Sequence, residues 1–214
     1  MKELKKGNML IVFILIFLCT AVSGSPAYSL ETRAGLSAGW LETFYFYDEK
    51  GTDNFVHEHF DSVEATALVD WRYLRLGIGY SRHVLSYIVD NTQEEKKFGD
   101  YNISFLNFSA TAKYSFSFFE GKLLLWPGIG LEYDYNLTYK KNGADLSGRY
   151  NELNDLYLTA GAGIDYAVLD GVWLTAMLLA GWNVTPRVGD HADVGHNFSG
   201  MNIRAHLGFL MRIL

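Results

Sequence analysis

Length, composition and charge set the first limits on this chain. Its 214 residues suit a single domain, and the 15% of aromatic residues with only three prolines indicate many strands rather than disorder. Acidic residues number 24 and basic residues 18, so the formal net charge is −6, which argues against nucleic acid as a partner.

The first residues have the pattern of a secretory signal peptide. Lys2, Lys5 and Lys6 precede an uninterrupted apolar run over residues 9–18. Ten residues are too few to cross a bilayer as a helix. Small residues follow the run and offer cleavage sites, so we expect an exported protein.

Cleavage between residues 23 and 27 would divide the chain into a signal peptide, 1–27, and one domain, 28–214. Cys19 is the only cysteine and ends the apolar run, where a lipoprotein signal would place its acylated residue. Leu18 precedes it where such signals carry a small residue, so removal of Cys19 with the signal peptide is the better interpretation. The mature domain then has no cysteine and 15 basic against 23 acidic residues, a formal charge of −8.

Apolar and polar residues alternate with a period of two along eight later segments. Most have about ten to fifteen residues, which fits tilted membrane strands. The first is the least regular, because Glu42 falls on its apolar parity, which indicates a bulge or an early exit from the lipid. The segments cover residues 33–47, 63–72, 74–81, 106–115, 123–136, 156–166, 172–182 and 201–213.

The connections between these segments alternate between short and long. Short turns at 70–73, 117–121 and 167–171 alternate with long polar connections at 48–61, 88–101, 137–152 and 186–200. Seven connections join eight strands and leave both termini on the side of the short turns. An even strand count with short turns on one side is how outer-membrane barrels are built. The sequence therefore predicts an all-β, up-and-down antiparallel transmembrane barrel.

Charged residues keep to the parity opposite the apolar rows. A charge that faces the bilayer midplane costs about 2–4 kcal/mol, so we expect these side chains to fill a polar lumen and to pair there. Aromatic residues near the strand ends suit girdles at the two lipid interfaces: Trp40, Tyr80, Tyr114, Tyr133 and Trp182. The charged set is Glu64, Asp70, Arg72, Arg75, Lys113, Glu132, Asp134, Asp165 and Arg204.

The C-terminal strand resembles the signal by which the barrel-assembly machinery selects the last strand of its clients. Residues 206–213 carry a polar residue, a glycine and spaced apolar residues, although the chain ends on Leu214 rather than on an aromatic residue. The domain resembles small eight-stranded bacterial outer-membrane β-barrel proteins, with no motif of one subfamily. The resemblance implies location in the bacterial outer membrane, outer-membrane lipids as partners and engagement of the assembly machinery through the C-terminal strand.

Two polar groups contain residue types that could bind a metal. One is Asp190, His191, Asp193 and His196 in the last long connection, and the other is His57, Glu58, His59 and Asp61 in the first. Neither spacing matches an established ligand pattern, and solvated polar loops are the better interpretation. We therefore predict no metal site and no cofactor.

Enzyme interpretations are weaker still. Lipid A deacylases of this size carry His-x-Ser, whereas His196 and Ser199 are three apart and would face opposite sides of a strand. Omptin-like proteases form larger barrels than the eight-stranded one predicted for this chain. Glu132 and Asp134 could act as paired carboxylates, but a salt-bridge network with Arg204 explains them better. We predict no catalytic residues.

The predicted role is therefore structural or interactive, with a surface ligand, if there is one, bound by the long connections. A small porin-like channel for ions or solutes and a lipid A-modifying enzyme are the alternatives. A soluble lipocalin-like barrel would share the alternation but reverse its faces, so parity alone does not exclude it.

Overall fold

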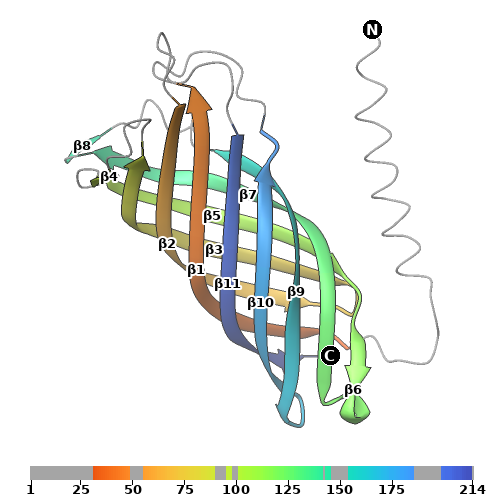
Figure 1. The fold of residues 1–214 in the computed structure, drawn as a ribbon. Coiled ribbons are helices and arrows are strands. Elements are labelled where there is room, and N and C mark those ends of the chain that lie inside the picture. The colour runs from red at the N-terminus through yellow and green to blue at the C-terminus, as the bar shows by residue number, and fades with distance from the viewer. Residues whose placement is uncertain are drawn as a thin grey trace, which may run out of the picture.

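Eight long antiparallel strands form the protein in a computed structural model (Figure 1). The structure describes residues 31–48, 55–89, 95–97, 101–141, 143–145, 154–185 and 199–213. The expected signal peptide with Cys19, and Leu214, lie outside them. Among the described residues, no helix is long and apolar enough to span a membrane. The long strands are β1 (Arg33–Asp48), β2 (Phe55–Asp70), β3 (Leu74–Val89), β5 (Tyr101–Lys113), β7 (Leu123–Lys141), β9 (Asp155–Leu169), β10 (Val172–Asn183) and β11 (Ser199–Arg212).

The long strands close into a barrel. Each pairs with its neighbours along the chain, and β11 pairs with β1 to complete the ring. Register partners followed once round from Arg33 return to β1 at Thr43, ten residues further along, so the strands are strongly tilted. This path runs through Asp70, Arg75, Thr111, Gly130, Thr159, Gly181 and Asn202. The predicted strand count and antiparallel topology are confirmed.

The short turns lie where the sequence predicts them. Residues 71–73 join β2 to β3, and Asp170 and Gly171 join β9 to β10. Between β5 and β7 the chain forms β6 (Phe116–Phe118), which pairs with β7, and a single 3₁₀ turn, η1 (Phe119–Gly121). The first strand begins and the last strand ends at this end of the barrel (Figure 1).

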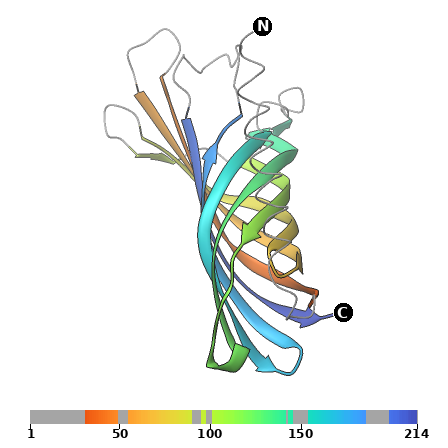
Figure 2. The same ribbon diagram turned by 90° about the vertical axis from the view of Figure 1, so that its right-hand side faces the viewer.

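The prediction of a long connection over 48–61 is wrong. The strands β1 and β2 extend to Asp48 and from Phe55, so most of that segment is paired strand. Two short strands, β4 (Glu95–Lys97) and β8 (Ala144–Asp145), likewise extend the sheet beside β3 and β7 within the connections expected at 88–101 and 137–152. Strands of 16 to 19 residues exceed the roughly 9–11 that cross a bilayer, so the wall continues beyond the lipid. Figure 2 shows β1 and β2 separating there from the opposite wall.

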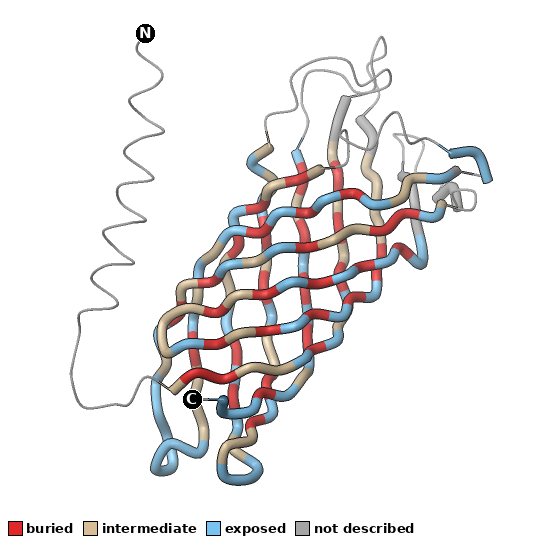
Figure 3. The backbone as a smooth tube through the Cα atoms, turned by 180° about the vertical axis from the view of Figure 1, so that it is seen from behind, coloured by how far each residue is buried: buried red, intermediate tan, exposed pale blue. Residues whose placement is uncertain are grey.

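Burial alternates along every long strand (Figure 3). In β11 the outward row is apolar, from Met201 to Met211, whereas Asn202, Arg204 and His206 are buried inside. The interior is thus polar and the exterior apolar, the reverse of a lipocalin-like barrel. This orientation excludes the soluble interpretation, because such a surface would expose a continuous apolar band to water.

One charged residue departs from the predicted parity. Arg72 lies in the turn after β2, and its guanidinium sits 4.8 Å from the centre of the Tyr73 ring. The turn ends the alternation, so position 72 belongs to neither face of the sheet. The other eight predicted charges are buried inside the barrel.

The bulge suggested for β1 lies elsewhere. No register shift interrupts β1 against either neighbour, and Glu42 keeps its outward parity. Register shifts occur in other strand pairs, and the one nearest Glu42 lies between β2 and β3, where Asp61 pairs with Leu85 and Ser62 with His83, so β3 carries Val84 as an extra residue. Glu42 therefore faces outward directly opposite Asp61.

Candidate functional site

Most of the buried charges among the described residues lie in the barrel interior, which is the candidate functional site. Among the described residues the buried ionisable side chains of the lumen include four cations and six anions, with two histidines. They are Arg33, Arg75, Lys113 and Arg204; Glu64, Asp70, Glu132, Asp134, Asp155 and Asp165; and His83 and His206. Buried charges are stable when they are paired and hydrogen-bonded, so their partners decide what the lumen can do.

Asp70 is the centre of a charged layer near the short turns. Its carboxylate lies 2.6 Å from Arg33 Nη2, 3.2 Å from Arg75 Nε and 2.9 Å from Lys113 Nζ. The three cations come from β1, β3 and β5, so this one carboxylate, on β2, connects four strands.

Asp165 completes this layer from the far wall. Arg75 Nη2 lies 3.0 Å from Asp165 Oδ1, and Thr175 on β10 donates a 2.7 Å hydrogen bond to the same atom. The guanidinium of Arg75 also donates from Nη1 to Thr175 Oγ1 at 3.2 Å, which links β3 to β10 on the opposite side of the ring. Trp126 covers the Arg75 guanidinium at 4.6 Å, a cation–π contact that shields the pair from water.

Arg204 is the centre of a second layer. Both of its terminal nitrogens bind Glu132 on β7, and its Nε lies 3.1 Å from Glu64 Oε2 on β2. Glu64 also accepts a 2.8 Å hydrogen bond from Thr66, and His206 Nε2 lies 3.4 Å from it. The guanidinium therefore connects three strands across the lumen.

Hydrogen bonds continue toward the long connections. Tyr45 on β1 donates to Asp155 on β9 at 2.6 Å, and Tyr157 donates to the same carboxylate at 3.3 Å. Beside them Leu41, Phe60 and Ile103 help to line a cavity of about 30 Å³, room for about one water molecule.

The two carboxylates considered as an acid–base pair both bind other side chains of the lumen. Glu132 is bound by Arg204, whereas Asp134 accepts a 2.6 Å hydrogen bond from Asn107 Nδ2. Each has its own partner, as a structural network requires.

The first histidine group is only partly brought together. His57, His59 and Asp61 lie on β2 with outward parity, whereas Glu58 alternates to the other side. Glu42, which the sequence did not assign to this group, lies beside His59 and Asp61. The second group, Asp190 to His196, lies outside the described residues, as does His196 of the His196/Ser199 arrangement; Ser199 begins β11.

Several lumen residues were not singled out from the sequence. Arg33, Tyr45, His83, Asp155 and Tyr157 are buried inside, although only their parity within β1, β3 and β9 could have indicated it. Their partners lie on other strands, which a single segment does not reveal.

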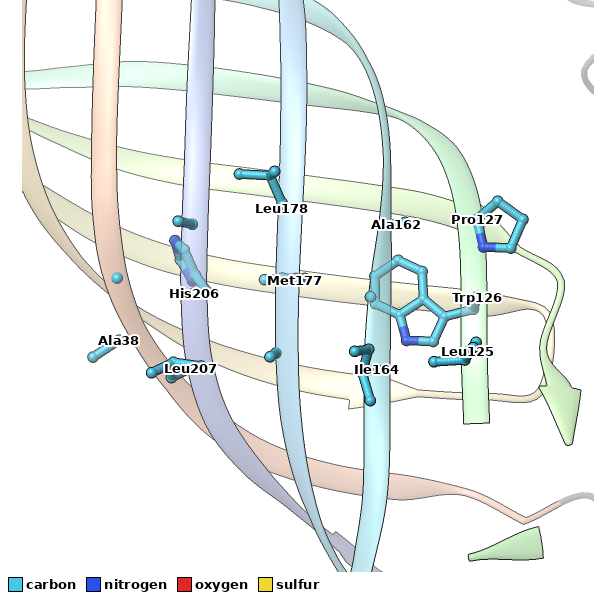
Figure 4. A pocket seen from close by; sticks show the side chains of 14 residues that line it. Ala38, Leu125, Trp126, Pro127, Ala162, Ile164, Met177, Leu178, His206 and Leu207 are labelled. Atoms are coloured by element: carbon cyan, nitrogen blue, oxygen red, sulfur yellow. The ribbon is translucent and has the colours of Figure 1, made fainter. Parts of the chain in front are cut away.

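The outer wall has an apolar depression of about 800 Å³ (Figure 4). Small outward residues of β1, β11, β10, β9 and β7 form the depression, and larger side chains such as Leu178 and Ile164 surround them. The small residues are Ala38, Ala205, Ala176, Ala162 and Pro127.

The predicted girdle residues are all exposed on the exterior, with Tyr114 stacked beside Tyr73 near the short turns.

Trp126 needs the glycine opposite it. A Cβ added at Gly163, its register partner, would lie 2.1 Å from the Trp126 ring and 2.8 Å from the Ala176 carbonyl oxygen. We expect Gly163→Leu to lower the free energy of unfolding by about 1–3 kcal/mol through overpacking. Urea titrations of the folded protein in micelles measure this loss. Adding Trp126→Leu should cost less than it does alone, and strict additivity would contradict the contact.

Comparisons with known proteins give architecture only. No family model matches the chain, and no curated protein matches its sequence. Among solved structures, it is similar to a major outer membrane protein of Thermus thermophilus, with 14% identity over 83% of this chain and 99% of that one and a TM-score of 0.45. It is similar to neisserial surface protein A, with 15% identity over 84% and 99% and a TM-score of 0.42. The outer membrane protein OprG of Pseudomonas aeruginosa gives 12% identity over 86% and 95% and a TM-score of 0.40.

These similarities assign neither a subfamily nor a function. The chain's own geometry is decisive for its environment: an even number of antiparallel strands, a closed ring without edges, charges inside and an apolar band outside. These are the properties of bacterial outer-membrane barrels, in which lipid surrounds the wall and every backbone group is paired between strands. The protein is an eight-stranded outer-membrane β-barrel.

Proposed function

We propose that the protein is a closed membrane anchor whose surface end makes contacts outside the cell. The barrel holds the chain in the outer membrane, the lumen does not conduct, and no reaction is assigned to it. The observation that carries this proposal is the pair of charged layers around Asp70 and Arg204, which connect strands on opposite sides of the lumen.

Closure follows from the chemistry of these layers. Arg75 and Asp165 are both nearly or fully buried and bound to one another, with Trp126 packed against the guanidinium. An ion could pass only if such a pair separated inside a narrow, low-dielectric lumen, which is strongly unfavourable because each charge would lose its partner.

The surface role is supported by the length of the wall. The outer ends of β1 and β2 carry stacked aromatic and histidine side chains on their exterior, among them Phe44 with His59 at 4.6 Å and Phe46 with His57 at 4.7 Å. Aromatic side chains are enriched at protein–protein interfaces. A wall that carries them beyond the lipid is therefore suited to bind a partner outside the cell.

Planar bilayer recordings test closure. Purified protein, refolded and reconstituted, should give no steady single-channel currents across the voltage range at which an inserted porin conducts. Insertion is checked by protease protection of the same preparation. Steady currents would contradict the anchor and favour a small channel; the excess of buried acidic over basic lumen residues would make such a channel cation-selective.

We also infer that β11 is the strand that the barrel-assembly machinery engages. Its pairing with β1 closes the barrel, so it is one of the two strands that must meet. Substituting two outward residues near its end, Phe209 and Met211, by serine should slow assembly in cells more than refolding in micelles.

A further inference from the structure

Three side chains on the outer wall converge from neighbouring strands. Glu42 on β1 is the register partner of Asp61 on β2, and His59 lies two residues before Asp61 on the same outward face. Diagonal neighbours on one face of an antiparallel pair are within reach of long side chains. The three side chains therefore meet just beyond Trp40, on the surface side of the apolar band.

Their ligand atoms are close enough for one ion. One imidazole nitrogen and two carboxylate oxygens lie within 4.8 Å of one another, and His59 Nε2 is 3.0 Å from Asp61 Oδ1. Ligand atoms bound to one tetrahedral Zn²⁺ at about 2.0–2.1 Å are separated by about 3.3 Å. Small side-chain rotations would bring the third ligand, Glu42, to the same distance.

Asp61 supplies a second and independent observation. The residue is only 8% exposed, although it lies on the outward parity, and the partner that the described part of the chain gives its buried Oδ1 is the His59 imidazole at 3.0 Å, in an ion pair without hydrogen-bond geometry. A buried carboxylate is costly unless its charge is compensated, and a neutral imidazole does not compensate it. A cation bound between Oδ1 and the His59 imidazole would compensate this oxygen directly.

The imidazole is held in place for such a role. Phe44 lies flat against the His59 ring, with 4.6 Å between centroids and 14° between planes. The neighbouring His57 is stacked in the same way on Phe46, at 4.7 Å and 12°, but it does not belong to the cluster. Position 57 is therefore a matched control for position 59.

We propose that Glu42, His59 and Asp61 bind a divalent first-row transition cation, with Zn²⁺ as the reference ion. One imidazole and two carboxylates form a borderline ligand set that suits such cations better than Ca²⁺ or Mg²⁺, which take oxygen ligands only. Three protein ligands leave one coordination position open to water. The ion would join β1 to β2 above the lipid and offset the charge of the two acidic residues.

Zinc titration of the full mature domain tests the site. The protein carries no affinity tag, is folded in micelles and is stripped of metal with EDTA. In this background protein His191 and His196 are changed to glutamine, so that the connection expected at 186–200 supplies no imidazole. Isothermal titration calorimetry should give one site per chain. His59→Gln, Asp61→Asn and Glu42→Gln should each weaken binding by about tenfold or more, and His57→Gln should leave it within about twofold.

Two results would overturn the site. One is the absence of saturable zinc binding by the stripped background protein, which would leave the His59–Asp61 contact as an ordinary ion pair. The other is an equal loss of affinity in His57→Gln and His59→Gln. Heat-modifiable gel migration confirms that each variant is folded, and zinc should raise the thermal midpoint of the background protein but not of His59→Gln.

Discussion

Replacing Arg204 with methionine should lower the free energy of unfolding by about 3–5 kcal/mol. Arg204 is 4% exposed, and it is the cation that Glu64 and Glu132 share. Methionine fills much of the same volume, so the loss would come from two buried carboxylates left without their counter-charge. The repulsion between these carboxylates would add to the desolvation cost.

Urea titration in micelles, followed by tryptophan fluorescence, measures the effect. Arg212→Met is the control, because Arg212 pairs with Glu31 at the exposed end of β11 and should leave the midpoint unchanged. The triple variant Arg204→Met, Glu64→Gln, Glu132→Gln should recover most of the loss, since it removes the uncompensated charges. If the single variant matched Arg212→Met, the second layer would not stabilise the barrel.

Parity was predictable from the sequence because it depends only on a period of two. Lys113, Glu132 and Asp165 could be assigned to the interior from the apolar rows beside them, and all three are buried there. Their pairing was not predictable. The contact between Arg75 and Thr175 depends on the tilt and stagger of the closed ring, which no single strand encodes.

Strand ends were the least predictable part of the fold. Residues 55–61 contain polar and histidine side chains, a composition that predicts a loop. In the structure these residues pair with β1 as far as Asp48. Cross-strand stacking of Phe44 on His59 compensates for the weak apolar pattern. Beyond the lipid the wall no longer needs an apolar row, so the alternation that marks a membrane strand disappears while the pairing continues.

Glu42 shows how a departure from pattern can carry information. In the sequence, Glu42 interrupts the apolar alternation of the first strand. In the structure β1 pairs with both neighbours without a register shift, so the irregularity is the charge of Glu42 on the outward face and not a bulge. An acidic side chain on the outward parity is tolerated where the wall leaves the hydrocarbon and where another group compensates its charge. The partner residues His59 and Asp61 could be found only from the register of β1 against β2.

The lipid-facing wall predicts a second large effect. Leu207→Arg should make folding into a bilayer less favourable by about 2–4 kcal/mol, because the charge would lie near the midplane. Leu207 is 71% exposed, and it lies midway between Ile203 and Met211 in the outward row of β11, with Ala38 and Ala176 as register partners. Figure 4 shows it on the outer wall beside Ala38.

Leu169→Arg is the matched control. Leu169 is 70% exposed but ends β9 beside the turn at Asp170, where an arginine can reach water and the cost falls to about 0–1 kcal/mol. Both variants are refolded from urea into lipid vesicles, and the folded fraction is read from unheated gels. In micelles the difference should shrink, because a micelle deforms around the charge. Equal losses at the two positions in vesicles would mean that the outward row near Leu207 does not face the bilayer midplane, and the placement of the membrane along β11 would have to change.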